Sequence, residues 1–399
     1  MDYKGPLTGV RVVDFTHVLG GPYASMLLGD MGAEIIKIEP PGRGDSTRLS
    51  GPPFQEGESA YFICVNRNKK SICLDLKKKE GVEVAKRLVK DCDVVTSSFR
   101  PGVMRRLGLG YEDLKKIRPD VIYGALSAFG REGPLKDKPG FELIIQGLTG
   151  LVSVTSEPGR RPGKIQIQVV DLCSGMFLAL AILGALYHRK LTGEGQRVDT
   201  SLLESTSALL ANLAGIYFMT GKVPVGMGTR NPQVMPSQAL KTKDSYILVV
   251  TQPNHWGKFC TALGKPEWIS DAPFSEPAYR VEHYDQTEKT VEEITTTKTT
   301  AEWMEIFDKH QVAATPINTV EEFFAEPQTK AVGLVETLTH PQTGPIQILK
   351  QPWNFSAAYG GVKSPPPRLG EHTEQVLKEA GLSPEEISSL KDQGVIFGS

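Results

Sequence analysis

The sequence contains no closely spaced pair of cysteines. Its five cysteines, Cys64, Cys73, Cys92, Cys173 and Cys260, are scattered over 399 residues, and no CxxC pair occurs. Zinc sites and the disulfide frameworks of small secreted domains both depend on close, regular cysteine spacing. The sequence therefore predicts no metal site and no disulfide framework, and we expect a cytoplasmic protein with reduced thiols.

The chain also has almost no net charge. Its 45 Lys and Arg residues balance 46 Asp and Glu residues, which gives a formal charge of −1 at pH 7. A protein without a net electrostatic field does not attract nucleic acid or an anionic membrane surface over a distance. We therefore expect neither partner, and an anionic ligand would have to be held by a local cluster of basic side chains.

Long hydrophobic runs are lacking as well. The longest, Leu172 to Tyr187, is interrupted by Ser174 and two glycines and is short for a membrane span. The N-terminal stretch MDYKGPLTGVRVVDF has none of the charged, apolar and cleavage regions of a signal peptide. Both observations predict a soluble, cytoplasmic protein in which residues 172–187 form a buried helix.

What the chain does have is a regular alternation of strand and helix patterns over its first 130 residues. Strands followed by helices are typical of a parallel sheet covered on both faces. The fold class expected is α/β, with an open Rossmann-like parallel sheet that begins with a glycine-containing first turn. The expected strands are residues 10–15, 33–39, 71–76, 93–99 and 121–129, and the expected helices are residues 23–31, 79–90 and 113–117.

The pattern changes further along the chain. Two long apolar helices are expected at residues 172–189 and 202–219, followed by a segment with one strand and several amphipathic helices. Strand patterns return near the C-terminus, and Ser383 begins a capping box that predicts a terminal helix. We expect residues 1–220 to form a large domain, residues 221–325 a smaller α/β domain, and residues 326–399 to return to the large domain.

The first turn, residues 17–22, suggests one kind of ligand site. Glycines after a first strand let the backbone approach a phosphate, and Glu39 ends the second strand where a dinucleotide fold binds a ribose hydroxyl. A nicotinamide-dependent dehydrogenase is therefore a competing hypothesis. It is weakened because the spacing is not GxGxxG and Pro22 stands where a close-packing glycine is needed. A plain tight turn explains the same residues.

Basic residues suggest a second site. Lys77 follows one expected strand, and Phe99 and Arg100 follow another, with Arg106 close behind. We expect these strands to be adjacent, so that their carboxyl ends present the basic side chains together at one edge of the sheet, where ligands of such folds bind. A phosphate-bearing ligand fits this arrangement, and a solvated charged rim is the alternative.

Two acids complete the candidate residues. Asp171 lies between the β-branched pair Val169-Val170 and an apolar helix, where it could simply cap that helix. A carboxylate there would also gain from the helix dipole, which lowers its pKa, and an ionised carboxylate can attack an activated acyl group. Glu142 begins another apolar helix and, taken alone, is a first-turn acid that complements the dipole.

In this order along the chain, these segments resemble the class III CoA-transferases, a family that includes formyl-CoA, carnitine and bile-acid CoA-transferases. The resemblance spans nearly the whole chain and includes the helix that contains Asp171. The other matching segments are LTGVRVVDFTHV (7–18), GAEIIKIE (32–39), NKKSICLDLK (68–77), FRPG (99–102), TGEGQ (192–196) and LGEHT (369–373).

The resemblance implies a function, a mechanism and an assembly. CoA would pass from a donor acyl-CoA thioester to an acceptor carboxylic acid through aspartyl anhydride and aspartyl-CoA thioester intermediates on Asp171, with Glu142 in the catalytic site. CoA would be a substrate, with no tightly bound cofactor. The large domain would be built from both chain ends, and two subunits would interlock as a homodimer or as a heterodimer with a related subunit. The residues implied at the CoA site are His17, Val18, Leu19, Leu74, Lys77, Ser98, Phe99 and Arg106.

The chain departs from formyl-CoA transferase at three places. Leu19 stands where that enzyme has a glutamine, and Pro40 stands where it has an arginine, so Arg43 is expected to supply that phosphate contact. Its glycine-rich loop has no clear counterpart near residues 226–228. Oxalate is therefore not the expected acceptor, and a partly apolar acid or a substituted dicarboxylate fits better.

The same resemblance is compatible with two other functions. An acyl-CoA racemase of the same fold pairs its aspartate with a histidine, but the matching stretch here, residues 139–142, reads PGFE. A non-catalytic subunit of a heteromeric transferase is the second rival, and the presence of Asp171 argues against it.

Overall fold

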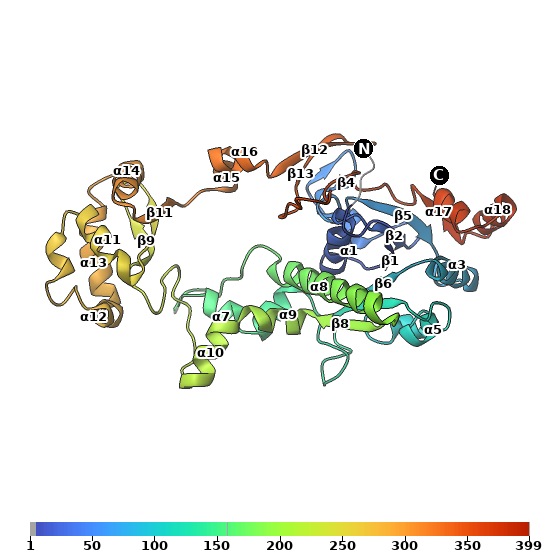
Figure 1. Ribbon diagram of the computed structural model, residues 1–399, viewed down its shortest axis with the longest axis horizontal. Helices are drawn as coiled ribbons and strands as arrows, with labels where there is room; N and C mark the ends of the chain where they lie inside the picture. The colour runs from blue at the N-terminus through green and yellow to red at the C-terminus, as the bar shows by residue number, and fades with distance from the viewer. Residues whose placement is uncertain (1–4, 158, 399) are drawn as a thin grey trace. The chain divides into compact units, whose positions relative to one another are not determined.

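The computed structural model describes residues 5–157 and 159–398, which form two compact units (Figure 1). Within the described residues, unit 1 contains residues 5–151, 165–221 and 334–398, so both ends of the chain contribute to it. Unit 2 contains Val152–Lys164 and Lys222–Gly333. The expected division assigned residues 152–164 and 326–333 to the large domain, whereas the described residues of both segments belong to unit 2.

The core of unit 1 is a seven-stranded sheet with the strand order β14-β5-β2-β1-β6-β7-β8. Six strands are parallel, and only β14 pairs antiparallel with its neighbour. The chain order reverses between β1 and β6, as in doubly wound nucleotide-binding folds, and the predicted parallel α/β sheet is confirmed. The strands are β1 (Arg11–Phe15), β2 (Glu34–Glu39), β5 (Lys69–Leu74), β6 (Val94–Ser97), β7 (Ile122–Ser127), β8 (Arg197–Ser201) and β14 (Ile396–Phe397).

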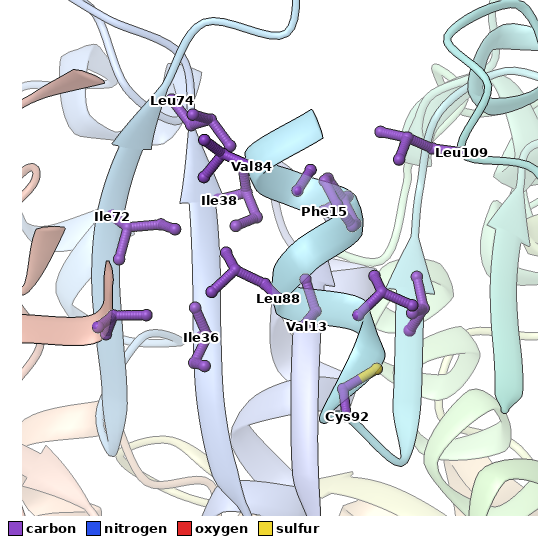
Figure 2. Packing of buried hydrophobic residues seen from close by; sticks show 14 of the residues in the cluster. Val13, Phe15, Ile36, Ile38, Ile72, Leu74, Val84, Leu88, Cys92 and Leu109 are labelled. Atoms are coloured by element: carbon purple, nitrogen blue, oxygen red, sulfur yellow. The ribbon is translucent and has the colours of Figure 1, made fainter. Parts of the chain in front are cut away.

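Alternating side chains divide the core between the two faces of this sheet, because successive residues of a strand point to opposite sides. Val13 and Ile36 belong to one buried cluster, which α3 (Lys79–Lys90) covers with Val84 and Leu88, as Figure 2 shows. The adjacent residue Val12 belongs to a second cluster on the other face, together with residues of α1 and α8. Both faces are therefore buried, which explains the β-branched runs in the sequence.

The remaining elements of unit 1 connect and cover this sheet. Helices α9 and α10 replace the single helix expected at residues 202–219, because the chain bends by 71° at Leu210. The helices are α1 (Gly20–Asp30), α2 (Ala60–Ile63), α4 (Val103–Arg106), α5 (Tyr111–Lys115), α6 (Glu142–Leu148), α8 (Val169–Thr192), α9 (Leu202–Leu209), α10 (Ala211–Thr220), α17 (Thr373–Glu379) and α18 (Pro384–Asp392), with the 3-10 turn η1 (Ser46–Leu49). Two hairpins pair β3 (Phe54–Gln55) with β4 (Glu58–Ser59) and β12 (Val335–His340) with β13 (Gly344–Leu349).

Helix α8 is both long and strongly apolar. By length and composition it could cross a membrane, with a mean hydropathy of 2.2, and α9 with α10 would pass the same test if the bent pair were one span. However, 44% of its most apolar window is buried inside the chain, where Val170, Leu178 and Ile182 pack against the sheet. This is the position of a core helix, as the sequence predicted.

Unit 2 is built around a small antiparallel sheet, β11-β10-β9. Its core contains Phe259, Trp303 and Phe307, whose rings stack in series, and the Trp303 indole N–H donates to the Thr295 carbonyl at 2.7 Å. The strands are β9 (Ser237–Lys241), β10 (Tyr246–Val250) and β11 (Ala313–Pro316). The helices are α7 (Leu151–Thr155), α11 (Trp256–Ala262), α12 (Pro277–Glu282), α13 (Tyr284–Thr295), α14 (Thr300–His310), α15 (Val320–Ala325) and α16 (Pro327–Val332), with the 3-10 turns η2 (Pro253–His255) and η3 (Pro266–Ile269).

Glycines allow α1 and α8 to approach very closely. A Cβ atom on Gly175 would lie 2.5 Å from the carbonyl oxygen of Gly20, and one on Gly20 would lie 2.9 Å from the carbonyl oxygen of Asp171. Real side chains do not tolerate such distances to a backbone atom. The missing Cβ atoms therefore bring the first turn of α8, with Asp171, against the first turn of α1.

We expect Gly175→Ala to destabilise unit 1 by about 1–3 kcal/mol, because the added methyl group must push the two helices apart. Chemical denaturation followed by circular dichroism measures the change. Gly257→Ala is the matched control, since a Cβ there has only an ordinary contact at 3.7 Å with Ile269. By helix propensity the control is expected to be neutral or stabilising. Equal free energies of unfolding for the two variants would show that the Gly175 contact does not limit the distance between α1 and α8.

Candidate active site

A pocket of about 460 Å³ lies at the carboxyl ends of β1, β6 and β7, where the strand order reverses. Ligands of doubly wound sheets bind at this position, because the loops diverge there and leave a crevice. Its walls come from the first turn (His17 to Gly21), the loop after β6 (Ser98 to Pro101), the end of β7 (Leu126 to Ala128), the segment from Lys136 to Glu142, and from Pro40, Gly44, Ser46, Asp171 and Leu202.

Asp171 is the third residue of α8, which begins at Val169. Val169 and Val170 are therefore helical and not the end of a strand, and the cap position belongs to Gln168, whose side chain makes no capping hydrogen bond. Asp171 is thus not the helix cap, which was one of the two interpretations of its position. Because the local sequence supplies no cap, the first N–H groups of α8 need an acceptor from elsewhere.

Glu142, the first residue of α6, supplies that acceptor. The backbone N–H of Val170 donates to Glu142 Oε1 at 3.2 Å, and the N–H of Asp171 donates to Glu142 Oε2 at 2.9 Å. The buried Gln146 in turn donates to Glu142 Oε1 at 2.7 Å and exchanges hydrogen bonds with the backbone of Ile165. Glu142 therefore caps α8 through space and lies next to Asp171.

The pKa of Asp171 is raised to about 7, first by burial and second by the negative charge of Glu142. The expectation that the helix dipole lowers this pKa is wrong. Glu142 already occupies the N–H groups that would have stabilised the Asp171 carboxylate. Within the described part of the chain, no hydrogen-bond donor or cation pairs with that carboxylate, so its oxygens remain available to a ligand.

Apolar side chains surround the acid. Leu19 is buried in a small cluster with Met26 and Val65, and Tyr61 and Leu172 pack against it. The pKa of Tyr61 is raised to about 12, first by burial and then by the charge of Asp171. Apolar side chains such as Leu19 limit the access of water to this part of the pocket.

The first turn and the loop after β6 meet at the pocket. The His17 N–H donates to Ser98 Oγ at 2.8 Å, and the His17 ring lies 5.3 Å from the ring of Phe99. Burial, and then the nearby Lys37 charge, lower the pKa of His17, so its ring is neutral at pH 7. The structure therefore brings Asp171 and Glu142 together with five of the residues expected at the CoA site: His17, Val18, Leu19, Ser98 and Phe99.

Of the expected basic residues, Arg100 lines this pocket, whereas Arg43, Lys77 and Arg106 do not, and neither does Leu74. Lys77 and Phe99 do not follow neighbouring strands, because β2 and β1 lie between β5 and β6. The side chain of Leu74 is buried in the core against α3, and Arg43 is exposed on the turn before η1. Arg106 lies over the turn after β6, with its Nη1 atom 3.2 Å from the position of a Cβ on Gly102.

Glu39 is not available to a ribose. Its carboxylate accepts hydrogen bonds from Arg48 at 2.7 and 2.8 Å, from Ser71 Oγ at 2.6 Å and from the Asp45 N–H at 2.9 Å. The first-turn glycine Gly21 serves packing, since a Cβ there would lie 2.4 Å from Thr16 Cβ. Neither Glu39 nor the first-turn glycine therefore supports binding of a dinucleotide, and that hypothesis is rejected.

Several site residues could not be found from the sequence. Lys136 and Lys138 line the pocket from a segment that has no periodic sequence pattern. Tyr61 lies in the short helix α2 and Gln146 in the apolar helix α6, and nothing in the local sequence distinguishes either residue. No local sequence pattern indicates that Glu142 lies next to Asp171, because the two acids are far apart in the chain and are brought together only by the fold.

Comparisons with known proteins find similarity to one family over nearly the whole chain. Residues 7–373 match the family described as CoA-transferase family III. The succinyl-CoA:glutarate CoA-transferase of Mus musculus is 38% identical over 95% of this chain and 87% of its own length. A formyl-CoA:oxalate CoA-transferase of Rhodopseudomonas palustris is 34% identical over 98% of this chain and 97% of its own. The crystal structure of a CAIB/BAIF family protein from Brucella suis shows a TM-score of 0.84 at 38% identity and covers 94% of this chain and 100% of that one.

The family match extends over nearly the whole chain, and the relatives are aligned over most of their own length. Their shared description as CoA-transferases agrees with the resemblance found in the sequence. The chain therefore belongs to CoA-transferase family III and is an enzyme of that class.

Proposed function

We propose that this enzyme transfers CoA from an acyl-CoA donor to a carboxylic acid acceptor through covalent intermediates on Asp171. The observation that carries the proposal is the unpaired Asp171 carboxylate in an apolar pocket at the switch point of the sheet. A carboxylate without bonding partners is a stronger nucleophile than one held by donors, and covalent catalysis replaces one difficult step by easier ones.

The proposed reaction proceeds in two mirrored halves. An Asp171 oxygen attacks the thioester carbonyl carbon, the C–S bond breaks, and CoA thiolate leaves a mixed anhydride. The thiolate then attacks the Asp171 carbonyl carbon, which forms an aspartyl-CoA thioester and releases the donor carboxylate. The acceptor carboxylate repeats both steps in reverse and leaves Asp171 free. Contacts to the remote nucleotide hold the thiolate near the anhydride between steps, so recapture is effectively unimolecular.

Glu142 is proposed to favour acylation of Asp171. The two acids repel each other while Asp171 is ionised, as the raised pKa of Asp171 indicates. Acylation removes the negative charge from Asp171 and so relieves the repulsion. Because Glu142 also holds the first N–H groups of α8, it keeps the position of Asp171 fixed through the reaction.

The CoA contacts are proposed along the same edge of the sheet. His17, Val18, Leu19, Ser98 and Phe99 would contact the thioester end, since they line the pocket with Asp171. The phosphates would lie further out, where exposed basic side chains follow β2, β5 and β6. These are Arg43, Lys77 and Arg106, with Leu74 at the end of β5 beneath them.

A partly apolar acid or a substituted dicarboxylate is the proposed acceptor. The buried Leu19 presents an apolar wall close to Asp171, and Lys136 and Lys138 add cations that suit a second carboxylate. The mouse relative is described as acting on succinyl-CoA and glutarate, both of which carry a second carboxylate. Oxalate lacks the methylene groups that an apolar wall would contact.

An interlocked dimer is proposed as the assembly, because unit 1 leaves many large apolar side chains exposed. Phe218 and Met219 of α10 are 80% and 88% exposed, far more than a monomer usually leaves to water on neighbouring residues. The exposed apolar residues of α6, α8 and α10 are Leu143, Ile144, Leu148, Met176, Phe177, Leu180, Tyr187, Leu191, Tyr217, Phe218 and Met219. The dimer is proposed to work in the cytoplasm, which suits five free cysteines.

The racemase alternative is not favoured. Among the described residues, His17 is the one histidine that lines the pocket, and its N–H and ring contact Ser98 and Phe99. Exchange of solvent deuterium into the acyl α-carbon would support a racemase, and its absence during CoA transfer would exclude one. A purified chain that transfers CoA without a second polypeptide would exclude the non-catalytic-subunit alternative.

We expect Asp171→Ala to lower kcat by about 10⁴-fold or more, because the covalent route is lost. Binding of CoA should persist, since the neighbouring lining residues are unchanged. Asp199→Asn is the control: this carboxylate pairs with Arg197 in β8 and does not line the pocket, so activity should stay within about twofold. Substantial transfer by Asp171→Ala would refute the nucleophile assignment.

The pH dependence follows from the raised pKa of Asp171. The neutral form cannot attack, so kcat/KM of the wild type should rise through about pH 7. Folding stability should fall as the pH rises from about 4 to about 7, because the folded state holds that proton more tightly than the unfolded state. Asp171→Asn should lack this fall, which denaturation at several pH values measures.

Glu142→Gln should move the kcat/KM midpoint to lower pH, because it removes the negative charge that raises the pKa of Asp171. Burial remains, so the midpoint should stay above the ordinary value of 3.8. Steady-state kinetics across pH 5–9 compare the two enzymes. An unchanged midpoint with full activity would contradict the proposed role of Glu142.

A panel of acceptors tests the proposed substrate class. With succinyl-CoA as donor, glutarate and substituted dicarboxylates should be used at least about tenfold more efficiently than oxalate, measured as kcat/KM. Leu19→Gln should narrow this difference, because it replaces the apolar wall by an amide that can bond a short dianion. Preference of the wild type for oxalate would overturn the acceptor proposal.

The oligomeric state can be measured directly. Size-exclusion chromatography with light scattering should give twice the mass of one chain at micromolar concentration, and dilution should not dissociate subunits that thread through one another. A monomer at this concentration would contradict the proposed assembly.

A further inference from the structure

The backbone of Val18 has an unusual conformation at the wall of the pocket. Its φ angle is +70°, in the left-handed region that β-branched residues rarely adopt. Such strain persists only where neighbouring groups hold the backbone in place, and it is often found at functional sites. Val18 lines the pocket and is 38% exposed, so its backbone conformation determines which of its atoms face a ligand in the pocket.

Three neighbouring groups hold the turn that contains Val18. The carbonyl of Thr16 accepts a hydrogen bond from Lys37 Nζ at 2.8 Å, and the N–H of His17 donates to Ser98. The N–H of Val18 donates to Asp45 Oδ1 at 3.2 Å. Of these contacts, the one to Asp45 acts on the strained residue itself.

Asp45 is itself firmly held. Its Oδ2 atom accepts from Lys37 Nζ at 2.9 Å, and its Oδ1 atom also accepts from the N–H and hydroxyl of Thr47. Its own N–H donates to Glu39, the buried acid at the end of β2. The carboxylate and Lys37 are both fully buried, so neither can move into solvent.

Lys37 remains charged in this position. Burial alone would lower the pKa of Lys37, but the carboxylates of Asp45, Asp14 and Glu39 outweigh it and raise the pKa above its ordinary value. A buried ion pair is weak evidence for a gain in stability, because apolar residues of similar volume often serve as well. The presence of such a pair next to the strained turn therefore points to a role in positioning.

We propose that Asp45, fixed by Lys37, is a positioning residue that holds the left-handed backbone of Val18 and so shapes the thioester end of the pocket. This role rests on the function proposed above for the pocket. Asp45 does not line the pocket and acts through the N–H of Val18. The ion pair fixes Asp45, and the Oδ1 acceptor fixes the turn.

Two double variants separate the acceptor from the buried charge. Lys37→Met/Asp45→Asn and Lys37→Met/Asp45→Leu both remove the ion pair, but only the asparagine keeps an oxygen for the Val18 N–H. By isothermal titration with CoA itself, the leucine variant should bind about tenfold more weakly than the asparagine variant. Adding Val18→Gly to the leucine variant should restore most of this loss, because glycine adopts a positive φ without strain.

Two controls accompany these variants. Val18→Gly in the wild type should change CoA affinity by less than the leucine variant does, since the turn is still held. Asp30→Asn removes another buried carboxylate, which pairs with Arg67 at the far end of α1. It should lower the melting temperature yet leave the dissociation constant of CoA within about twofold, because Asp30 is remote from the turn.

A second readout does not depend on CoA. Amide hydrogen exchange of Val18 should be slow in the wild type and in Lys37→Met/Asp45→Asn, and fast in Lys37→Met/Asp45→Leu. If the wild type binds no CoA, the proposed function fails, while the exchange rates still decide whether Asp45 holds Val18. Asp45→Asn alone keeps the acceptor and should keep both exchange and affinity near the wild type. Should the leucine variant not fold, Lys37→Met/Asp45→Ala takes its place, since it also lacks the acceptor and should exchange the Val18 N–H fast.

Three outcomes would overturn the proposal. One is equal CoA affinity and equal Val18 exchange in the asparagine and leucine double variants. Another is a loss of affinity in the leucine variant that Val18→Gly does not recover. The third is a loss in Asp45→Asn as large as that of the leucine variant, because the charge, and not the acceptor, would then be responsible.

Discussion

The hydrogen bonds from the first turn of α8 to Glu142 are the interaction on which the site depends. They satisfy N–H groups that the local sequence leaves without a cap, and they fix the start of α8 relative to α6. They also place a negative charge beside Asp171 and remove the donors that would otherwise bind its carboxylate. This contact therefore fixes the position of Asp171 and, together with burial, raises the pKa of its carboxyl group.

The sheet makes this contact possible. The reversal of strand order between β1 and β6 opens a crevice, and the glycine contact between α1 and α8 brings Asp171 to it. A buried network beneath the crevice, centred on Lys37 and Asp45, holds the first turn. Two structural features therefore position the pocket residues: the first turn of α8, which Glu142 holds, and the buried ion pair of Lys37 and Asp45.

Much of the fold could be predicted because β-branched runs and glycine turns are local signals. They located most strands of the parallel sheet and the core helix α8. They placed the start of α8 at residue 172, whereas it begins at Val169. They failed for Lys77 and Phe99, because strand neighbours are not set by chain order. Asp171 and Glu142 were identified by resemblance. Their mutual contact and the direction of the Asp171 pKa depend on long-range packing, which no local pattern contains.

The most direct test of the account is chemical trapping of the acyl enzyme. The enzyme would be incubated with succinyl-CoA, quenched with hydroxylamine or borohydride, and digested for peptide mass spectrometry. The account predicts a hydroxamate or a reduced side chain at Asp171, dependent on the thioester and absent in Asp171→Ala. Complete transfer of CoA to an acceptor with no modification at Asp171 would contradict it.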